Sequence, residues 1–467
     1  WTAGKEVSLT TFARESGAFY LPPSFTADTD LSPIAPAEPV IVRGMGLAAT
    51  DLVVLLTEGR GGRFTRDPSG LRYLPSGREP RLFLGSRRGV PYHAKITSRL
   101  KGTRPGARFF TARRAAELAG RRRLDFARQV WPFIAKEMLH GYYAELFTGH
   151  PQHVRVRWAQ FAERFAPLDP FGQGLRALVA ASVPDPADRL DLARLTRPLA
   201  GRRFEGSGAL QEALRGYIRD DLRRRTLPRH SASLGLFLSL LESFGVVVGM
   251  AGADWTAASR ARDLEGWWRP YFSSIASGPP ARRLEELLAL SRAGVVTFLG
   301  GGLEVTGDAR SGTFLARGEN APGEVAAAAL VDAWLPAPRA AHGPDPLLRH
   351  LVDTGQAREA PLGHGRTTGR IEVVPDAFAV VGADGSPHPA RYALGPFTSA
   401  PVTGAFTRPG TNGLAFREND RLARRVLAAL SKPSGPPPGR SASAAPTREH
   451  RVFADTRTDR GTAYYAA

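Results

Sequence analysis

Apolar positions along the chain follow two spacings, which predict strands and helices. Residues 40–42 form a short β-branched run bounded by Pro and Gly, which is typical of a buried parallel strand. Residues 47–58 have apolar positions at helical spacing, and residues 81–84 predict a second buried strand. Between them, residues 62–74 predict a β-hairpin that turns at 67–70.

Helical spacing continues through residues 105–293, where Gly and Pro separate the segments. The segments expected to be helical are 111–120, 122–147, 154–165, 185–195, 208–225, 231–249 and 281–292. Beyond them the β pattern returns. The segments expected to be strands are 295–299, 303–305, 313–315, 326–331, 371–374 and 378–381, and a closing helix is expected at about 415–430. Residues 1–38 predict only extended pieces and Pro-rich turns, and the Gly-rich segment 363–369 predicts a loop.

These patterns predict an α/β fold that carries a large all-helical insertion. We expect a nucleotide-binding Rossmann unit with a preceding connector at 1–104 and the helical insertion at 105–293. A β-rich return to the nucleotide-binding body, with its closing helix, is expected at 294–430. The tail, 431–467, is rich in Pro, Ser, Gly and Ala and has little to bury, so we expect it to be disordered.

The most informative motif is a Gly-x-Gly-x-x-Ala that follows the first predicted strand and opens the first helix. In a dinucleotide site the first Gly makes the tight turn and the second lets the backbone approach a pyrophosphate. The third small residue lets the helix pack on the strand, and the helix N-terminus faces the phosphates. We predict such a site at Gly44, Gly46 and Ala49, with a generic strand-to-helix turn as the alternative. The same spacing at 172–177 follows no predicted strand, so we interpret it as structural.

The loop after the second predicted strand favours NADP over NAD. An NAD-preferring site places an acidic residue there to bind the ribose hydroxyls. Here the strand is followed by Ser86, Arg87 and Arg88, with no carboxylate. A hydroxyl and two guanidiniums suit a 2′-phosphate, because charge-assisted hydrogen bonds to phosphate are strong. The alternative is a surface loop that is merely rich in Arg.

Composition excludes several other classes of function. The chain has 467 residues and no Cys, which excludes disulfides, thiolate metal sites and Cys nucleophiles. Its net charge of +19 comes mostly from Arg spread over the whole length without interleaved aromatic residues, so nucleic-acid binding is not favoured. The ten His show neither HxH nor HExxH spacing, so we predict no metal centre. No acid–base constellation stands out, and catalytic residues stay unassigned.

The partners and the compartment are expected to be those of a cytoplasmic enzyme. The longest apolar run, 234–250, is interrupted by Ser, Glu and Gly, which makes it too polar for a membrane span. The N-terminus lacks the apolar core of a signal peptide. We therefore expect a protein that acts on a small molecule and has neither a membrane nor a nucleic acid as its partner.

Several blocks taken together resemble the bacterial FAD/NAD(P)-binding proteins, two-dinucleotide flavoproteins related to flavin N-hydroxylating monooxygenases. The blocks are GMGLAATD at 44–51, LTEGRGG at 56–62, YLPSG at 73–77, RLFLGSRRGVPY at 81–92 and the segment 392–420 with GPFTSAPVTGAFTRPGTN. The resemblance implies an ADP site for FAD and a second Rossmann unit for NADPH. Gly44, Gly46 and Ala49 match the second unit, Ser86, Arg87 and Arg88 match its 2′-phosphate loop, and Gly395, Pro396 and Thr398 match the strand end that approaches the flavin.

The first FAD fingerprint of that family would precede Trp1, so we expect this chain to lack that segment. The resemblance implies a FAD- and NADPH-dependent oxidoreductase, more specifically a flavin monooxygenase, in which hydride passes from NADPH to the flavin. Two alternatives stay open. One is a non-catalytic NADP-binding or sensor protein that keeps only the second nucleotide site, and the other is a basic scaffold for nucleic acid.

Overall fold

A computed structural model describes residues 3–68, 70–103, 106–250, 252–363, 365–375, 377–400 and 412–431. The chain divides into two compact units, Trp1–Ala337 and Pro338–Ala467, each of which is described by itself. The fold is a mixed α/β fold with a parallel sheet and many helices.

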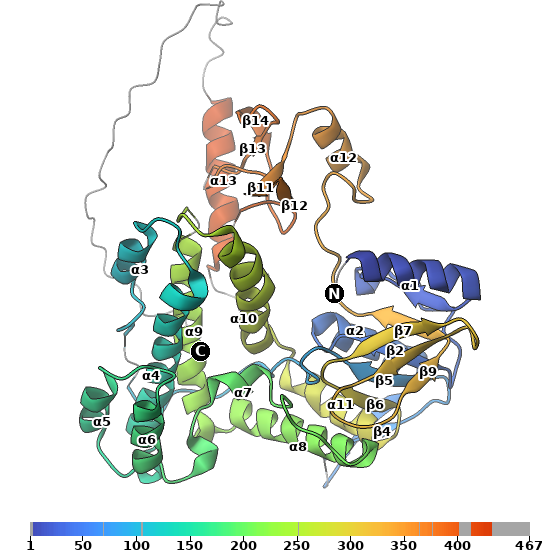
Figure 1. Cartoon of the computed structure of the whole chain (residues 1–467), viewed down its shortest axis with the longest axis horizontal. Coiled ribbons are helices and arrows are strands. Elements are labelled where there is room, and N and C mark those ends of the chain that lie inside the picture. The colour runs from blue at the N-terminus through green and yellow to red at the C-terminus, as the bar shows by residue number, and fades with distance from the viewer. Residues whose placement is uncertain are drawn as a thin grey trace, which may run out of the picture. The chain divides into compact units, whose positions relative to one another are not determined.

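The first unit is built on a five-stranded parallel sheet (Figure 1). Its strand order is β1 (Phe19–Leu21), β10 (Ala329–Asp332), β2 (Pro39–Arg43), β5 (Arg81–Gly85) and β6 (Val296–Gly300). From β2 the chain adds β5 and then β6 on one side, whereas β10 pairs with the other side of β2. The carboxyl ends of β2 and β10 therefore form a topological switch point, which is where open α/β sheets bind their ligands.

Alternate residues of β2 face two different layers, because side chains of a strand point to opposite faces. Val40 and Val42 pack with α2 (Leu47–Leu56), with the hairpin β3 (Arg63–Asp67) and β4 (Gly70–Leu74), and with α8 (Ser207–Thr226) and α11 (Ala281–Arg292). Ile41 packs on the other face with α1 (Ala3–Ser16) and with the antiparallel sheet β7 (Glu304–Asp308), β8 (Thr313–Arg317) and β9 (Val325–Ala327). The parallel sheet is thus covered on both faces.

Two sequence predictions for this unit are wrong. The single strand predicted at 326–331 is two strands, because the chain leaves the antiparallel sheet after Ala327 and joins the parallel sheet at Ala329. A continuous apolar run cannot show such a change of sheet. Residues 1–38 contain a helix, α1, as well as extended pieces; its few apolar residues, such as Leu9 and Ala13, are buried under β7–β9. The hairpin at 62–74 and the strands at 40–42 and 81–84 are confirmed.

The helical stretch forms a second core within the first unit. Its helices are α3 (Ala112–Ala119), η3 (Phe126–Val130), α4 (Trp131–Gly149), α5 (Trp158–Phe165), α6 (Gln173–Ser182), α7 (Leu192–Thr196), α9 (Ala232–Gly249), η7 (Ser259–Trp268) and α10 (Arg269–Ala276). The sequence did not predict α6, η7 and α10; η7 is wound as a π-helix, which lacks a 3.6-residue period. Helix α6 opens at the second Gly-x-Gly motif, with Gly172 as its N-cap and no strand before it.

Short 3₁₀ turns complete the first unit. They are η1 (Thr26–Asp28), η2 (Glu58–Arg60), η4 (Pro151–His153), η5 (Pro186–Asp188) and η6 (Pro228–His230). Helix α9 is the one helix of the described residues that length and composition would allow to cross a membrane. It packs along α4, where the facing Gly141 and Gly235 leave no room for a Cβ on either helix, as in the core of a helical domain.

The second unit holds two small antiparallel pairs and two helices. Its elements are α12 (Pro346–Asp353), β11 (Glu359–Gly363), β12 (Arg366–Ile371), β13 (Ala379–Val381), β14 (Pro387–Tyr392) and α13 (Leu414–Leu430). The loop predicted at 363–369 is wrong, because β11 and β12 form a hairpin through it. The strand pair predicted at 371–374 and 378–381 is reduced to one bridge, since β13 pairs with β14 instead. The closing helix is confirmed as α13, and the predicted tail, 431–467, lies outside the described residues except for Ser431.

Candidate functional site

The turn at residues 44–46, which follows β2 and is called the Gly44 corner below, lies at the switch point of the sheet. Gly44 has a φ of +128°, and its N–H donates to the carbonyl oxygen of Gly85 at 2.8 Å. A Cβ on Gly44 would lie 2.7 Å from the carbonyl oxygen of Ala333, the residue that follows β10. Both the backbone angle and this close approach require glycine at the position.

The N-terminus of α2 opens beside this corner without a side-chain cap. Gly46 is the N-cap residue and has no side chain to accept the first N–H groups of the helix. A Cβ on Gly46 would lie 3.2 Å from Cζ of Tyr92, whose ring therefore borders the space in front of the helix. Tyr92 is held there by a 3.2 Å hydrogen bond from its N–H to the carbonyl oxygen of Met45. Ala49 is buried, which lets α2 lie close to the sheet.

A buried ion pair joins the two strands of the switch point. The guanidinium of Arg43, the last residue of β2, donates two hydrogen bonds to the carboxylate of Asp332, the last residue of β10. The Tyr20 hydroxyl donates to the same carboxylate at 2.7 Å, and the Arg43 guanidinium lies 5.4 Å from the ring centroid of Trp334. Both charged side chains are at most 2% exposed. The pair fixes β10 against β2 directly beneath Gly44 and Ala333.

The residues predicted to bind the 2′-phosphate, 86–88, belong to a tight turn at 86–89 that contacts the end of β6. Ser86 Oγ accepts from the N–H of Gly89 at 2.9 Å, and the N–H of Ser86 donates to the carbonyl oxygen of Gly300 at 3.3 Å. A Cβ on Gly89 would lie 2.3 Å from the nitrogen of Gly301, so the turn and the strand end touch backbone to backbone. Arg87 is exposed at the tip of this turn, at the carboxyl edge of the sheet.

Arg88 differs from Arg87, because it is partly buried. Burial lowers the pKa of the Arg88 guanidinium, and the charges of Arg87 and Arg197 act in the same direction. Burial raises the pKa of Tyr217 and of Tyr271, and the charge of Arg88 opposes that rise for both phenols. The charge of Arg88 thus acts on Tyr217 of α8 and on Tyr271 of α10.

His93 anchors the loop between these helices. Its Nδ1 lies 2.5 Å from Oδ1 of Asp221 on α8, and its Nε2 lies 2.8 Å from the carbonyl oxygen of Leu195. The backbone N–H of His93 donates to the carbonyl oxygen of Ser274 on α10 at 2.9 Å. A carboxylate oxygen and a carbonyl oxygen thus flank the two ring nitrogens of His93. Asp221 also accepts from the N–H of Ala94 at 2.8 Å.

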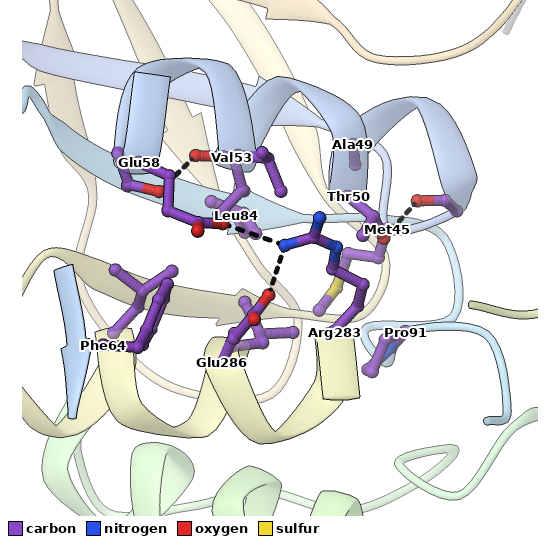
Figure 2. Close-up of a pocket in the computed structure, with 15 residues that line it drawn as sticks. Met45, Ala49, Thr50, Val53, Glu58, Phe64, Leu84, Pro91, Arg283 and Glu286 are labelled. Carbon is purple, nitrogen blue, oxygen red and sulfur yellow. Dashed lines mark hydrogen bonds and ion pairs between the residues drawn. The ribbon is translucent and has the colours of Figure 1, made fainter. Parts of the chain in front are cut away.

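A crevice beside Gly46 runs between α2 and α11 (Figure 2). Arg283 spans it and forms ion pairs with Glu58 at 2.9 Å and with Glu286 at 2.6 Å. The remaining space is about 20 Å³, which is room for a single water molecule. Arg283 pairs with two carboxylates and thereby links η2 to α11, and the space that remains is too small for a nucleotide.

The three site residues predicted near the C-terminus belong to the second unit. Gly395 has a φ of +112° and opens a turn in which the Thr398 hydroxyl donates to the Gly395 carbonyl oxygen at 2.8 Å. Thr398 is fully buried and forms an isolated parallel β-bridge with Ile371, whereas Gly395 and Pro396 are exposed. Thr398 therefore holds the turn, and Gly395 and Pro396 present their backbone at its surface. The remainder of that block, 401–411, lies outside the described residues.

The structure adds residues that sequence spacing did not assign to the site. They are Arg43, Tyr92, Tyr217, Asp221, Tyr271 and Asp332. The one local signal was Arg43 itself, since a charged residue ending a buried strand needs a partner. Tyr217, Asp221 and Tyr271 come from helices more than 100 residues away in sequence, Asp332 ends strand β10, and Tyr92 lies in the loop after β5. Among the described residues no group of three or more His, Asp or Glu is placed to hold a metal ion. The site is suited to binding an anionic nucleotide.

Comparison with known proteins gives matches over almost the whole chain. The chain is 37% identical to the nitrosuccinate-forming L-aspartate N-monooxygenase of Streptomyces cremeus over 446 residues, which are 90% of this chain and 65% of that protein. It is 36% identical to the enzyme of the same name from Streptomyces davaonensis, over 91% of this chain and 67% of that protein. It is 33% identical to a nitrosuccinic acid synthase of Aspergillus oryzae, over 90% and 65%. The chain thus spans about two thirds of the length of these relatives, and no protein-family model matches it.

Proposed function

Because the chain belongs to the family of the nitrosuccinate-forming L-aspartate N-monooxygenases, which are flavin-dependent monooxygenases, we propose that it takes part in the flavin- and NADPH-dependent oxidation of an amino acid at its amino nitrogen. L-aspartate is the proposed substrate, on the names of the relatives. The observation that carries the proposal is the crossover from β2 through Gly44 and Gly46 into α2, at the switch point of a parallel sheet.

The residues at this crossover fit a pyrophosphate. Gly44 allows the tight turn against Ala333, Gly46 adds no side chain in front of the helix, and the uncapped N-terminus of α2 supplies N–H donors and partial positive charge. The described residues contain one such crossover, so they fit one dinucleotide, which we assign as NADPH. We propose that Gly395 and Pro396 face the flavin, with Thr398 shaping their turn, on the resemblance of that segment.

FAD, when bound, supplies the electron transfer and oxygen chemistry. The residues of this chain have a different task, which is to bind and orient the nucleotide. The N–H groups of α2 hold the pyrophosphate, the ring of Tyr92 bounds its outer side, and Ser86 and Arg87 hold the 2′-phosphate at the end of β5. Ser86 keeps its hydroxyl proton for a ligand, because its oxygen accepts from Gly89 within the turn.

Activity and colour test the proposal against a non-catalytic NADP-binding protein. We expect purified protein to be yellow and to oxidise NADPH faster when L-aspartate is added, with an oxidised amino-acid product found by mass spectrometry. Stabilisation by NADPH without bound flavin and without turnover would favour the sensor hypothesis. Salt-sensitive retention on DNA in the absence of either result would favour the nucleic-acid scaffold.

The Arg87→Ala variant tests the choice of cofactor. Loss of a charge-assisted hydrogen bond costs about 1.5–3 kcal/mol, so we expect the Kd for NADPH to rise about tenfold or more, and the Kd for NADH to stay within about twofold. The measurement is a fluorescence or calorimetric titration with each nucleotide. Arg81→Ala is the matched control, because Arg81 is also exposed but lies at the opposite end of β5. Equal losses for NADPH and NADH would overturn the assignment of Arg87 to the 2′-phosphate.

A further inference from the structure

A loop of the helical stretch is fastened to the carboxyl edge of the parallel sheet by the buried side chain of Asn320. The loop, 199–204, lies between α7 and α8. Nδ2 of Asn320 donates to the carbonyl oxygens of Leu199 and Arg202 at 3.0 and 2.9 Å. At the end of the loop the N–H of Phe204 donates to the carbonyl oxygen of Asn320 at 2.8 Å, and the Phe204 ring packs against the core that β2 shares with α8 and α11. The loop is therefore held at both ends.

The same amide holds the turn that follows β6, and that turn contacts the turn of Arg87. Oδ1 of Asn320 accepts from the N–H of Gly301 at 2.6 Å. The N–H of Gly302 donates to the carbonyl oxygen of Arg87 at 3.3 Å. Asn320 is 1% exposed, so its side chain is a fixed joint rather than a surface contact. One buried amide thus ties the loop of the helical stretch and the turn of Arg87 to the end of the same strand.

The guanidinium of Arg203 is oriented at this joint. It donates to the carbonyl oxygen of Glu319, whose own N–H donates to the carbonyl oxygen of Gly301 at 2.9 Å. Arg203 is exposed, as Arg87 is. A guanidinium carries several N–H donors in a planar fork, so one bond to a carbonyl orients the group and leaves donors for a ligand. Arg203 and Arg87 therefore reach solvent from two segments that meet at the same turn.

The charges carried by these segments favour a multiply charged anion. Four arginines, at 87, 88, 202 and 203, stand against the single carboxylate of Glu319. That carboxylate lies beside the turn, since a Cβ on Gly302 would lie 2.6 Å from its Oε2. A phosphomonoester carries a charge of about −1.5 to −2 at neutral pH and three acceptor oxygens, and arginine pairs with it through charge-assisted hydrogen bonds. A phosphomonoester is thus the ligand group that best matches the excess of guanidinium.

We propose that Arg203, which lies in the helical stretch, completes the 2′-phosphate site, so that the phosphate binds between the guanidiniums of Arg87 and Arg203. Asn320 is the positioning residue that joins the two segments, and Glu319 lowers the affinity by like-charge repulsion. The source of the phosphate, the adenosine 2′-position of NADPH, rests on the proposed function. The consequence is that the choice of cofactor depends on the helical stretch as well as on the turn after β5.

The test titrates the purified chain with adenosine 2′,5′-bisphosphate and with adenosine 5′-monophosphate, two probes that differ only in the 2′-phosphate. We expect Arg203→Met to raise the Kd of the bisphosphate about tenfold, because a charge-assisted contact is lost, and to change that of the monophosphate by less than about twofold. Glu319→Gln should act in the opposite direction and lower the Kd of the bisphosphate about twofold to fivefold, since it removes an exposed like charge. Both effects should shrink as salt is added.

Arg176→Met is the matched control for Arg203→Met. Arg176 is also an exposed arginine of the helical stretch whose guanidinium donates to a backbone carbonyl, that of Phe171 at 2.7 Å, but its helix, α6, packs in the helical core. This variant removes the same charge and should leave both Kd values within about twofold of the wild type. If Arg203 only fixed its loop, Arg203→Met would weaken both probes alike, and Glu319→Gln, which keeps the Glu319 carbonyl oxygen, would leave the Kd of the bisphosphate unchanged.

An unchanged Kd of the bisphosphate in Arg203→Met would overturn Arg203 as a phosphate ligand, and so would equal losses for the two probes. An unchanged or higher Kd of the bisphosphate in Glu319→Gln would show that the phosphate does not lie beside Glu319. These failures leave the proposed function standing, provided that the wild-type chain binds NADPH more tightly than NADH. A wild-type chain that binds neither NADPH nor the bisphosphate would overturn the proposed cofactor and the role of Arg203 together.

Discussion

Replacing Asp332 by Ala is expected to lower the free energy of unfolding of the first unit by about 3–5 kcal/mol. The carboxylate of Asp332 is the partner of Arg43 in the sheet, and both side chains are almost wholly buried. Removing the carboxylate leaves the guanidinium charged in an environment that water does not reach, and it also removes the acceptor of the Tyr20 hydroxyl. Denaturant unfolding followed by circular dichroism measures the loss.

The matched control for Asp332→Ala is Glu304→Ala, which breaks the exposed ion pair with Arg317 and should cost less than about 1 kcal/mol. The double variant Arg43→Met with Asp332→Leu replaces both charges by apolar side chains and should recover most of the stability. If Asp332→Ala were as stable as Glu304→Ala, the ion pair would not hold β10 to β2.

The corner at Gly44 was predictable because its determinants are local. A β-branched strand, a Gly-x-Gly turn and an apolar helix follow one another within about 20 residues, and each has its own sequence pattern. The partner of that corner was not predictable in the same way. Ala333 approaches Gly44 only because β10 inserts between β1 and β2. The pattern of small residues at 326–331 does not indicate which strands this segment pairs with.

The difference between Arg87 and Arg88 shows a second limit of sequence patterns. The two residues are adjacent and chemically identical, so spacing assigned both to one phosphate. In the structure Arg87 is exposed, whereas Arg88 is partly buried. The loop that follows them is held by a contact between His93 and Asp221, 128 residues away in sequence. Non-local packing therefore decides how far each of two equal charges is exposed.

The Gly44→Ala variant is expected to have a Kd for NADPH about 100-fold or more above that of the wild type. Its Cβ would meet the carbonyl oxygen of Ala333 at 2.7 Å, and backbone on both strands would have to move at the proposed pyrophosphate site. The positive φ adds strain of about 1–3 kcal/mol, which lowers stability as well. Gly70→Ala is the matched control, because Gly70 has a similar φ of +116° but no atom within 4 Å of the added Cβ. The Gly70→Ala variant should lose stability to the same backbone strain but keep its affinity for NADPH. Thermal unfolding measures the stability, and NADPH titration measures the affinity. A Gly44→Ala protein that binds NADPH as tightly as Gly70→Ala would show that the nucleotide does not lie at this corner, and with it the proposed cofactor site would be lost.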